Sequence, residues 1–167
     1  VRPSVHKRHR QMPQNIRRPK DWRNKTATPA QVRLKEYAEA EKVLREASHY
    51  APNFYDLWEP LAAALFFQGK FEEAVLAYDW MIYFNVNGEN AYVNKAAALG
   101  SAKKLPEALL TLKQAEDRFP DKPKIFVNQA VTYLKLVMSS EARLAVKKAE
   151  ALGGNDPQLD QIKRMLR

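Results

Sequence analysis

Apolar residues recur along most of the chain with the spacing of an amphipathic helix. Trp58, Leu61, Ala62 and Leu65 lie three, four and seven positions apart, so they share one helix face. A break follows at residues 68–70, and residues 71–81 hold a second run with the same spacing. We therefore expect two antiparallel helices, each of about 13 residues, joined by a short turn.

The pattern repeats every 34 residues, in register and without an insertion. Alanine fills one position of the repeat in all four units. The recurring positions are Ala40, Ala74, Ala108 and Ala142; Leu44, Tyr78, Leu112 and Val146; Ala47, Met81, Ala115 and Ala149; Tyr37, Phe71, Leu105 and Ser139; Trp58, Tyr92 and Phe126; Ala62, Ala96 and Ala130; and Leu65, Leu99 and Tyr133. Because one hairpin cannot bury its apolar face alone, we expect the hairpins to stack around a continuous core.

These residues and their period resemble the tetratricopeptide repeat (TPR), a family with a 34-residue unit. Residues 55–88 match best, residues 89–122 match well, and residues 123–156 match less well because Ser139 replaces a large apolar residue. Residues 21–54 match only in their second half, which indicates half a repeat. The resemblance implies an all-α fold, a right-handed α-solenoid of antiparallel helix hairpins over residues 28–156.

The ends of the repeat region are expected to differ from its middle. Thr28 and Pro29 have the features of an N-cap and a first helical residue, so we predict a helix from about residue 29 to 49. Residues 157–167 predict a capping helix with Leu159, Ile162, Met165 and Leu166 on its apolar face. At Pro60 two outcomes stay open: a kink in the second turn, or a helix that starts late.

Positive charge is concentrated at the N-terminus. The chain carries a net charge of +9, and residues 1–25 hold nine Lys or Arg and one acid, a net charge of +8. Residues 1–27 contain three prolines and no apolar period, which predicts an extended basic arm that does not fold alone. Clustered arginines bind phosphates, and Trp22 can stack on a base, so we expect contact with RNA or an acidic protein surface. The residues expected to make it are Arg2, Lys7, Arg8, Arg10, Arg17, Arg18, Lys20, Trp22, Arg23 and Lys25.

Composition argues against several kinds of chemistry. The chain has no cysteine, which excludes disulfides, thiolate zinc sites and thiol nucleophiles. His6 and His9 lack further rigid ligands, and His49 is expected to end a helix. Without a phosphate loop or a Ser/His/Asp set, we expect no enzyme activity, no metal site and no cofactor. No apolar run approaches 18 residues, so we expect no transmembrane span.

The resemblance also implies a concave groove, lined by the first helix of each hairpin, that takes a peptide or a partner helix. Its implied lining is Glu59, Ala63, Asn94, Ala97, Lys124, Asn128 and Val131. Asn94 and Asn128 are equivalent, and we favour their binding a peptide backbone over the alternative of local hydrogen bonds. The two-carboxylate clamp of some family members is disfavoured, because Glu59 and Ala63 replace its first lysine and asparagine.

Trp80 and Tyr83 form a second candidate surface, since they occupy positions where the family usually has polar residues. Exposed aromatic residues are candidate interface anchors. The alternative, partial burial under the N-terminal arm or a loop, stays open.

Three functions remain. The favoured one is a structural subunit of a large hetero-complex, with the repeats on proteins and the arm on RNA. The others are an adaptor or assembly factor that binds client peptides, and an accessory subunit of a membrane-bound energy-converting complex. The sequence begins at Val1, so we expect that residues upstream were removed or left out. An intracellular, organellar or bacterial cytoplasmic location is compatible with this composition.

Overall fold

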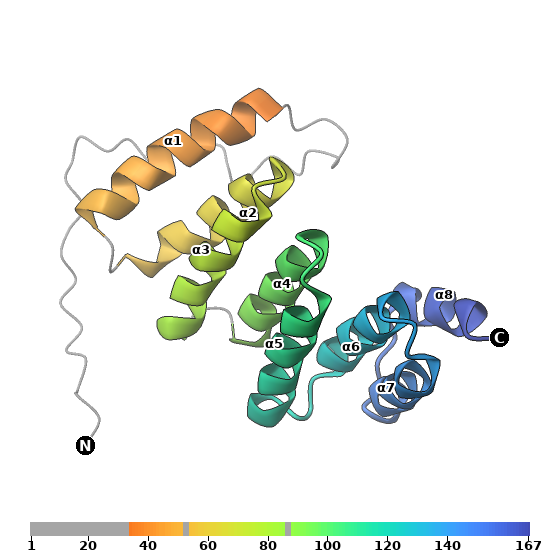
Figure 1. Ribbon diagram of the computed structural model, residues 1–167. Helices are drawn as coiled ribbons and strands as arrows, with labels where there is room; N and C mark the ends of the chain where they lie inside the picture. The colour runs from red at the N-terminus through yellow and green to blue at the C-terminus, as the bar shows by residue number, and fades with distance from the viewer. Residues whose placement is uncertain (1–33, 52–53, 86–87) are drawn as a thin grey trace, which may run out of the picture.

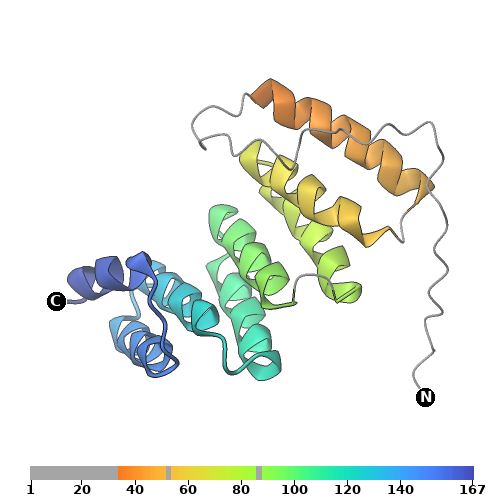
Figure 2. The ribbon, with the colours of Figure 1, turned by 180° about the vertical axis from the view of Figure 1, so that it is seen from behind.

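The structure, a computed structural model, describes residues 34–51, 54–85 and 88–167, and these residues contain helices and no strand. In chain order the elements are α1 (Leu34–Tyr50), the 3-10 helix η1 (Tyr55–Leu57), α2 (Trp58–Phe67), α3 (Phe71–Tyr83), α4 (Gly88–Ser101), α5 (Leu105–Arg118), α6 (Pro123–Lys135), α7 (Ser139–Ala151) and α8 (Pro157–Met165). Helix pairs follow one another from α1 at one end to α8 at the other (Figures 1 and 2). Neighbouring helices in the sequence make most of the contacts. The predicted stack of hairpins is confirmed.

The recurring alanines lie at close contacts between helices. Ala74, Ala108 and Ala142 have no exposed surface, whereas Ala40 of α1 is half-buried. Larger residues of the repeat, such as Met81 and Leu112, fill the space between helices. We expected a continuous core, and the buried side chains instead form three clusters along the stack, two of which share Val75 and Ile82 at their margins.

The turn inside each hairpin requires left-handed backbone at one position of the repeat. Gly69, Lys103 and Val137 stand 34 residues apart and have φ angles of 79°, 62° and 61°. The backbone N–H of the next residue then bonds back to a carbonyl five residues earlier, at 2.9 Å in all three hairpins. This is the Schellman closure of a helix, and it confirms the predicted break at residues 68–70.

Two details of the helix ends were open or wrong. Helix α2 begins at Trp58, after η1, so Pro60 lies in the first turn, where its missing N–H costs nothing. The late start is therefore the correct alternative for Pro60. In α8, Leu159, Ile162 and Leu166 are buried but Met165 is exposed, so placing Met165 on the apolar face was wrong. Six residues of helix turn Met165 about 120° away from Leu159.

The N-terminal part of the chain is described only from residue 34. Helix α1 ends at Tyr50 with His49 in its last turn, as expected. Thr28, the predicted helix start near residue 29 and the whole arm of residues 1–27 lie outside the described residues. None of the described helices is long and apolar enough to span a bilayer.

Candidate functional site

Helices α2, α4 and α6 are the first helices of the three hairpins and carry the seven expected groove positions. Ala97, Asn128 and Val131 line one hollow of about 150 Å³ bounded by α4, α5 and α6. The structure therefore brings three of the seven positions together. The other four do not line this hollow: Glu59 and Ala63 lie on α2, Asn94 on α4 and Lys124 on α6.

The hollow is lined by small residues on its α4 side and by both polar and apolar residues on its α6 side. Ala96, Ala97 and Gly100 contribute little bulk on the α4 side. The hydroxyl of Ser101 donates to the carbonyl of Ala97 at 2.9 Å, so its hydrogen is used within the helix. Lys135, at the end of α6, is the one charged residue of the lining.

Asn128 makes the local hydrogen bond that the sequence left open. Its Nδ2 donates to the carbonyl of Lys124 at 2.8 Å, which leaves a second amide hydrogen and the oxygen for a ligand. Lys124 Nζ in turn donates to Asn90 Oδ1 at 2.7 Å, across a separation of 34 residues. Equivalent positions of adjacent repeats are therefore in contact between α4 and α6. Asn94 is half-buried on α4.

Sequence reasoning missed part of this surface. Asn90, Gly100, Ser101 and Lys135 were not among the expected lining residues. A signal for them existed, since Ser101 and Lys135 follow Ala97 and Asn128 by four and seven residues on the same helix faces. Asn90 occupies the same repeat position as Lys124.

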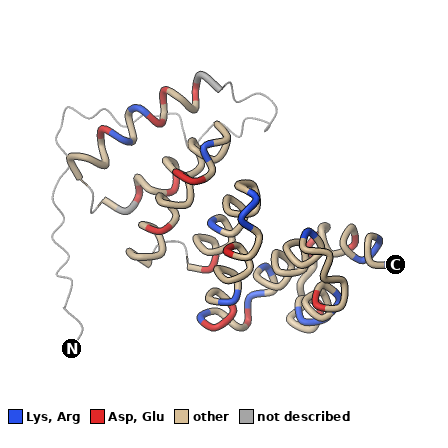
Figure 3. The backbone as a smooth tube through the Cα atoms, viewed as in Figure 1, with Lys and Arg blue, Asp and Glu red and all other residues tan. Residues whose placement is uncertain are grey.

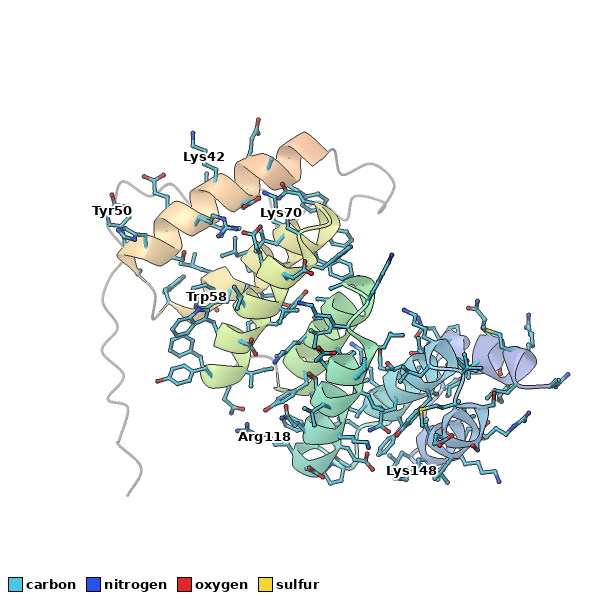
Figure 4. The ribbon with its side chains drawn as sticks, viewed as in Figure 1. Lys42, Tyr50, Trp58, Lys70, Arg118 and Lys148 are labelled. Atoms are coloured by element: carbon cyan, nitrogen blue, oxygen red, sulfur yellow. The ribbon has the colours of Figure 1, made fainter. Side chains whose placement is uncertain are left out.

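The second surface is an aromatic patch, defined here as Trp58, Trp80, Tyr83 and Phe84. Trp80 stacks on Trp58 and on Phe84, with centroid distances of 5.4 and 5.8 Å, and meets Tyr83 edge-on at 5.8 Å. Trp80 is 43% exposed and Tyr83 is 76% exposed, whereas Trp58 is buried. The patch lies at the edge of the molecule where Figure 4 labels Trp58. Both residues proposed as anchors therefore reach the surface.

Glu116 of α5 binds two later helices. Its carboxylate accepts hydrogen bonds of 2.8 Å from Gln129 of α6 and from Lys148 of α7. Burial alone would raise the pKa of Glu116, but these two hydrogen bonds outweigh it and lower the pKa. Lys148 Nζ also lies 5.3 Å from the ring centroid of Phe126. These contacts are structural, since they join α5, α6 and α7.

The described residues contain no group of three His, Cys, Asp or Glu side chains that could hold a metal ion. The largest pKa rise has a simple structural cause. Burial, with a smaller effect from Glu59, raises the pKa of the Tyr78 hydroxyl to about 12. A phenol so hard to ionise is a core residue and a poor general base.

The geometry defines an α-solenoid of stacked helix hairpins with a hollow between α4, α5 and α6 and an aromatic patch. Solved structures with this fold are those of tetratricopeptide-repeat proteins, so the fold of this chain is the TPR solenoid. A TPR protein from Parabacteroides merdae superposes with a TM-score of 0.67 at 18% identity, over 79% of this chain and 53% of that one. The TPR2AB domain of yeast Sti1, solved as a complex with pHSP90, gives 0.62 at 22% identity, over 80% and 55%.

MamA MSR-1 gives a TM-score of 0.61 at 21% identity, over 70% of this chain and 67% of that one. The match spans about half of the Parabacteroides and yeast chains. No protein-family profile and no curated protein matches the sequence. At these identities the comparisons establish the fold.

Proposed function

We propose that this protein is a non-enzymatic scaffold, a subunit of a larger hetero-complex, that binds another polypeptide along α2, α4 and α6 and contacts RNA through its basic arm. The observation that supports the first part is the hollow at Ala97, Asn128 and Val131, three of the residues that the family resemblance implies as groove lining. The small residues that line it leave space for side chains of a ligand. The second amide hydrogen and the carbonyl oxygen of Asn128 can form hydrogen bonds with a peptide backbone.

The chemistry of the groove favours some polypeptides over others. The yeast Sti1 neighbour was solved with pHSP90, which supports a polypeptide as the ligand class. Lys124 and Lys135 add positive charge on the side formed by α6, whereas Glu59 adds an exposed carboxylate on α2. A peptide with one acidic or neutral residue near α6 suits this polarity better than a tail that needs two clamped carboxylates.

Blocking the hollow tests the groove. Random peptides displayed on phage are selected for binding to the full chain. The affinity of the selected peptides is then measured for the natural chain and for Ala97→Arg, which fills the hollow with a long cationic side chain. We expect a loss of at least tenfold in affinity, about 1.4 kcal/mol. Leu110→Arg, at an exposed position of α5, is the matched control and should bind normally. Equal binding by Ala97→Arg would show that the selected peptides bind elsewhere.

The arm is proposed to bind RNA because residues 1–25 carry a net charge of +8, with arginines in clusters. A fluorescent single-stranded RNA is titrated at several salt concentrations. Each phosphate contact adds about 0.7 to the slope of log affinity against log salt, so changing Arg8, Arg10, Arg17 and Arg18 to Gln should lower the slope by about 2 to 3.

Four matched substitutions to Gln on α7 and α8, at Arg143, Lys147, Lys163 and Arg164, control for total charge. If they lower the slope as much as the arm substitutions do, the arm is not the RNA site. Peptide capture that is insensitive to salt and survives neutralisation of the arm, without any RNA binding, would favour the adaptor function instead.

A further inference from the structure

The aromatic patch and the last hairpin fill the same two repeat positions with different kinds of residue. Trp58 and Phe126 occupy the same repeat position, and so do Trp80 and Lys148. In the last hairpin, Lys148 places its ammonium 5.3 Å from the centre of the Phe126 ring. In the first hairpin, Trp80 covers Trp58 instead, at 5.4 Å. The chain thus places a cation beside one of these two aromatic residues and a second ring beside the other.

Trp80 and its neighbours present ring surface to solvent. Tyr83 is largely exposed, and Trp80 is exposed over nearly half of its surface. Tyr50, at the end of α1, adds a further exposed ring on the same edge of the molecule (Figure 4). Trp and Tyr faces attract guanidinium and ammonium groups, most strongly when the cation is partly desolvated.

The charge around the patch has the sign that attracts cations. Residues 34–83 carry nine acids and four Lys or Arg, a net charge of −5, whereas residues 84–167 carry nine acids and fourteen bases, a net charge of +5. Acidic positions are spread along α1, α2 and α3 (Figure 3). Glu46 near the end of α1, Asp56 in η1 and Glu59 in the first turn of α2 are exposed, at the helix ends nearest the patch.

We propose that the aromatic patch binds the chain's own basic arm, with arginine or lysine side chains of residues 7–25 lying over Trp80 and Tyr83. The chain itself supplies the complementary charge, since residues 1–25 carry +8 and the first hairpin with α1 carries −5. An arm tethered to α1 has a high effective concentration at this surface, so weak cation–π and ionic contacts are sufficient. This docking does not rest on the proposed contact with RNA.

The tether is long enough for this contact. Helix α1 has 17 residues, which corresponds to a length of about 25 Å. Arg23 lies 11 positions before Leu34 and can reach up to about 36 Å from it, and the earlier arginines reach farther. The arm can therefore run back along the whole of α1 to the patch.

Site-specific photo-crosslinking on the full chain tests the proposal without RNA. A benzophenone amino acid replaces Tyr83, and the crosslinked peptides are identified by mass spectrometry. The control carries the same group at Leu144, an exposed residue of α7 in the basic part of the chain. We expect crosslinks to residues 1–27 from position 83, few from position 144, and loss of the former in 1 M salt, where the Debye length falls to about 3 Å.

A second variant separates docking from simple proximity. Trp80→Lys copies the arrangement of Lys148 over Phe126, so the fold should be retained, which circular dichroism checks. It removes the ring and adds a repelling charge, and should abolish the crosslinks from position 83 to the arm. Unchanged crosslinking in Trp80→Lys, or equal yields from positions 83 and 144, would overturn the proposal. Crosslinks between heavy and light isotope-labelled copies in a mixture would also overturn it, because the occupant would then be a second copy's arm.

Discussion

Glu41 of α1 accepts a hydrogen bond of 2.7 Å from Lys70, the residue just before α3. The same carboxylate also accepts hydrogen bonds of 2.8 Å from Arg45 and from Gln68. Only 8% of Glu41 is exposed, so its charge is largely enclosed by these three donors. One side chain therefore ties α1 to the turn between α2 and α3.

The first prediction concerns the pH dependence of this contact. Burial would raise the pKa of Glu41, but hydrogen bonds from Lys70, Arg45 and Gln68 outweigh it and hold the pKa at about 2, below the ordinary 4.5. Because the folded-state pKa is the lower one, the stabilisation is present above pH 4.5 and is lost as the pH falls toward 2. We expect Glu41→Gln to cost about 1–2 kcal/mol at pH 7, since Lys70 and Arg45 are partly solvated.

Urea denaturation at pH 7, 5 and 3 measures this effect. The gap in unfolding free energy between the natural chain and Glu41→Gln should narrow at pH 3. Glu39→Gln, at an exposed position of the same helix, serves as the control and should change little at any pH. If this difference in unfolding free energy stays constant from pH 7 to pH 3, the charge of the Glu41 carboxylate does not contribute to stability.

Much of the fold could be predicted because a fixed period encodes which face of each helix is buried. The burial of Ala74, Ala108 and Ala142 could be predicted without knowing which residues they contact, because every repeat has an alanine at this position. The start of α2 could not be predicted this way. It depends on η1, a local turn that has no counterpart in the other hairpins among the described residues, and this moved Pro60 into the first turn.

The candidate site was predictable only where repeat position alone decides exposure. Ala97, Asn128 and Val131 line the hollow between α4, α5 and α6, and the resemblance to the repeat family had placed them on one common lining. The hydrogen bond from Lys124 to Asn90 depends on a rotamer and on the distance between α4 and α6, and neither can be read from the period.

The second prediction uses the strained turn residues. Val137 has a φ of 61° and is 86% exposed, so it bears left-handed strain without packing that offsets it. Replacing Val137 by glycine removes a left-handed backbone strain of about 1–2 kcal/mol. Glycine costs about 0.5–1 kcal/mol in chain entropy. Val137→Gly should therefore stabilise the protein by roughly 0.5–1 kcal/mol. Gly69→Val, the reverse change at the equivalent turn, should destabilise it. Thermal unfolding of both variants measures these effects. A lower melting temperature for Val137→Gly than for the natural chain would contradict the claim that Val137 is strained.

The third prediction compares two adjacent glycines after α7. A Cβ at Gly154 would lie 2.7 Å from the carbonyl oxygen of Ala149 and 2.9 Å from Pro123 Cβ, and neither neighbour can move easily. Gly154→Ala should therefore cost about 1–3 kcal/mol. Gly153 has a φ of 74° but no atom within 4 Å of a Cβ, so Gly153→Ala should cost only about 1 kcal/mol. Chemical denaturation that ranks Gly153→Ala as the more damaging change would show that this turn does not pack closely on α6.

The fourth prediction tests the close approach of helices that the whole stack requires. Ala108 of α5 has no exposed surface, so a larger side chain must push α5 away from its neighbours. Ala108→Leu should cost about 1–3 kcal/mol of unfolding free energy, although it adds apolar surface. Leu110→Ala, two residues away at an exposed position, should cost under about 0.5 kcal/mol. Leu112 of the same helix lines the hollow, so Ala108→Leu should also weaken groove-selected peptides. If urea denaturation shows Ala108→Leu to be as stable as the natural chain, the helices do not meet at this alanine, and the groove built from their spacing would lose its basis.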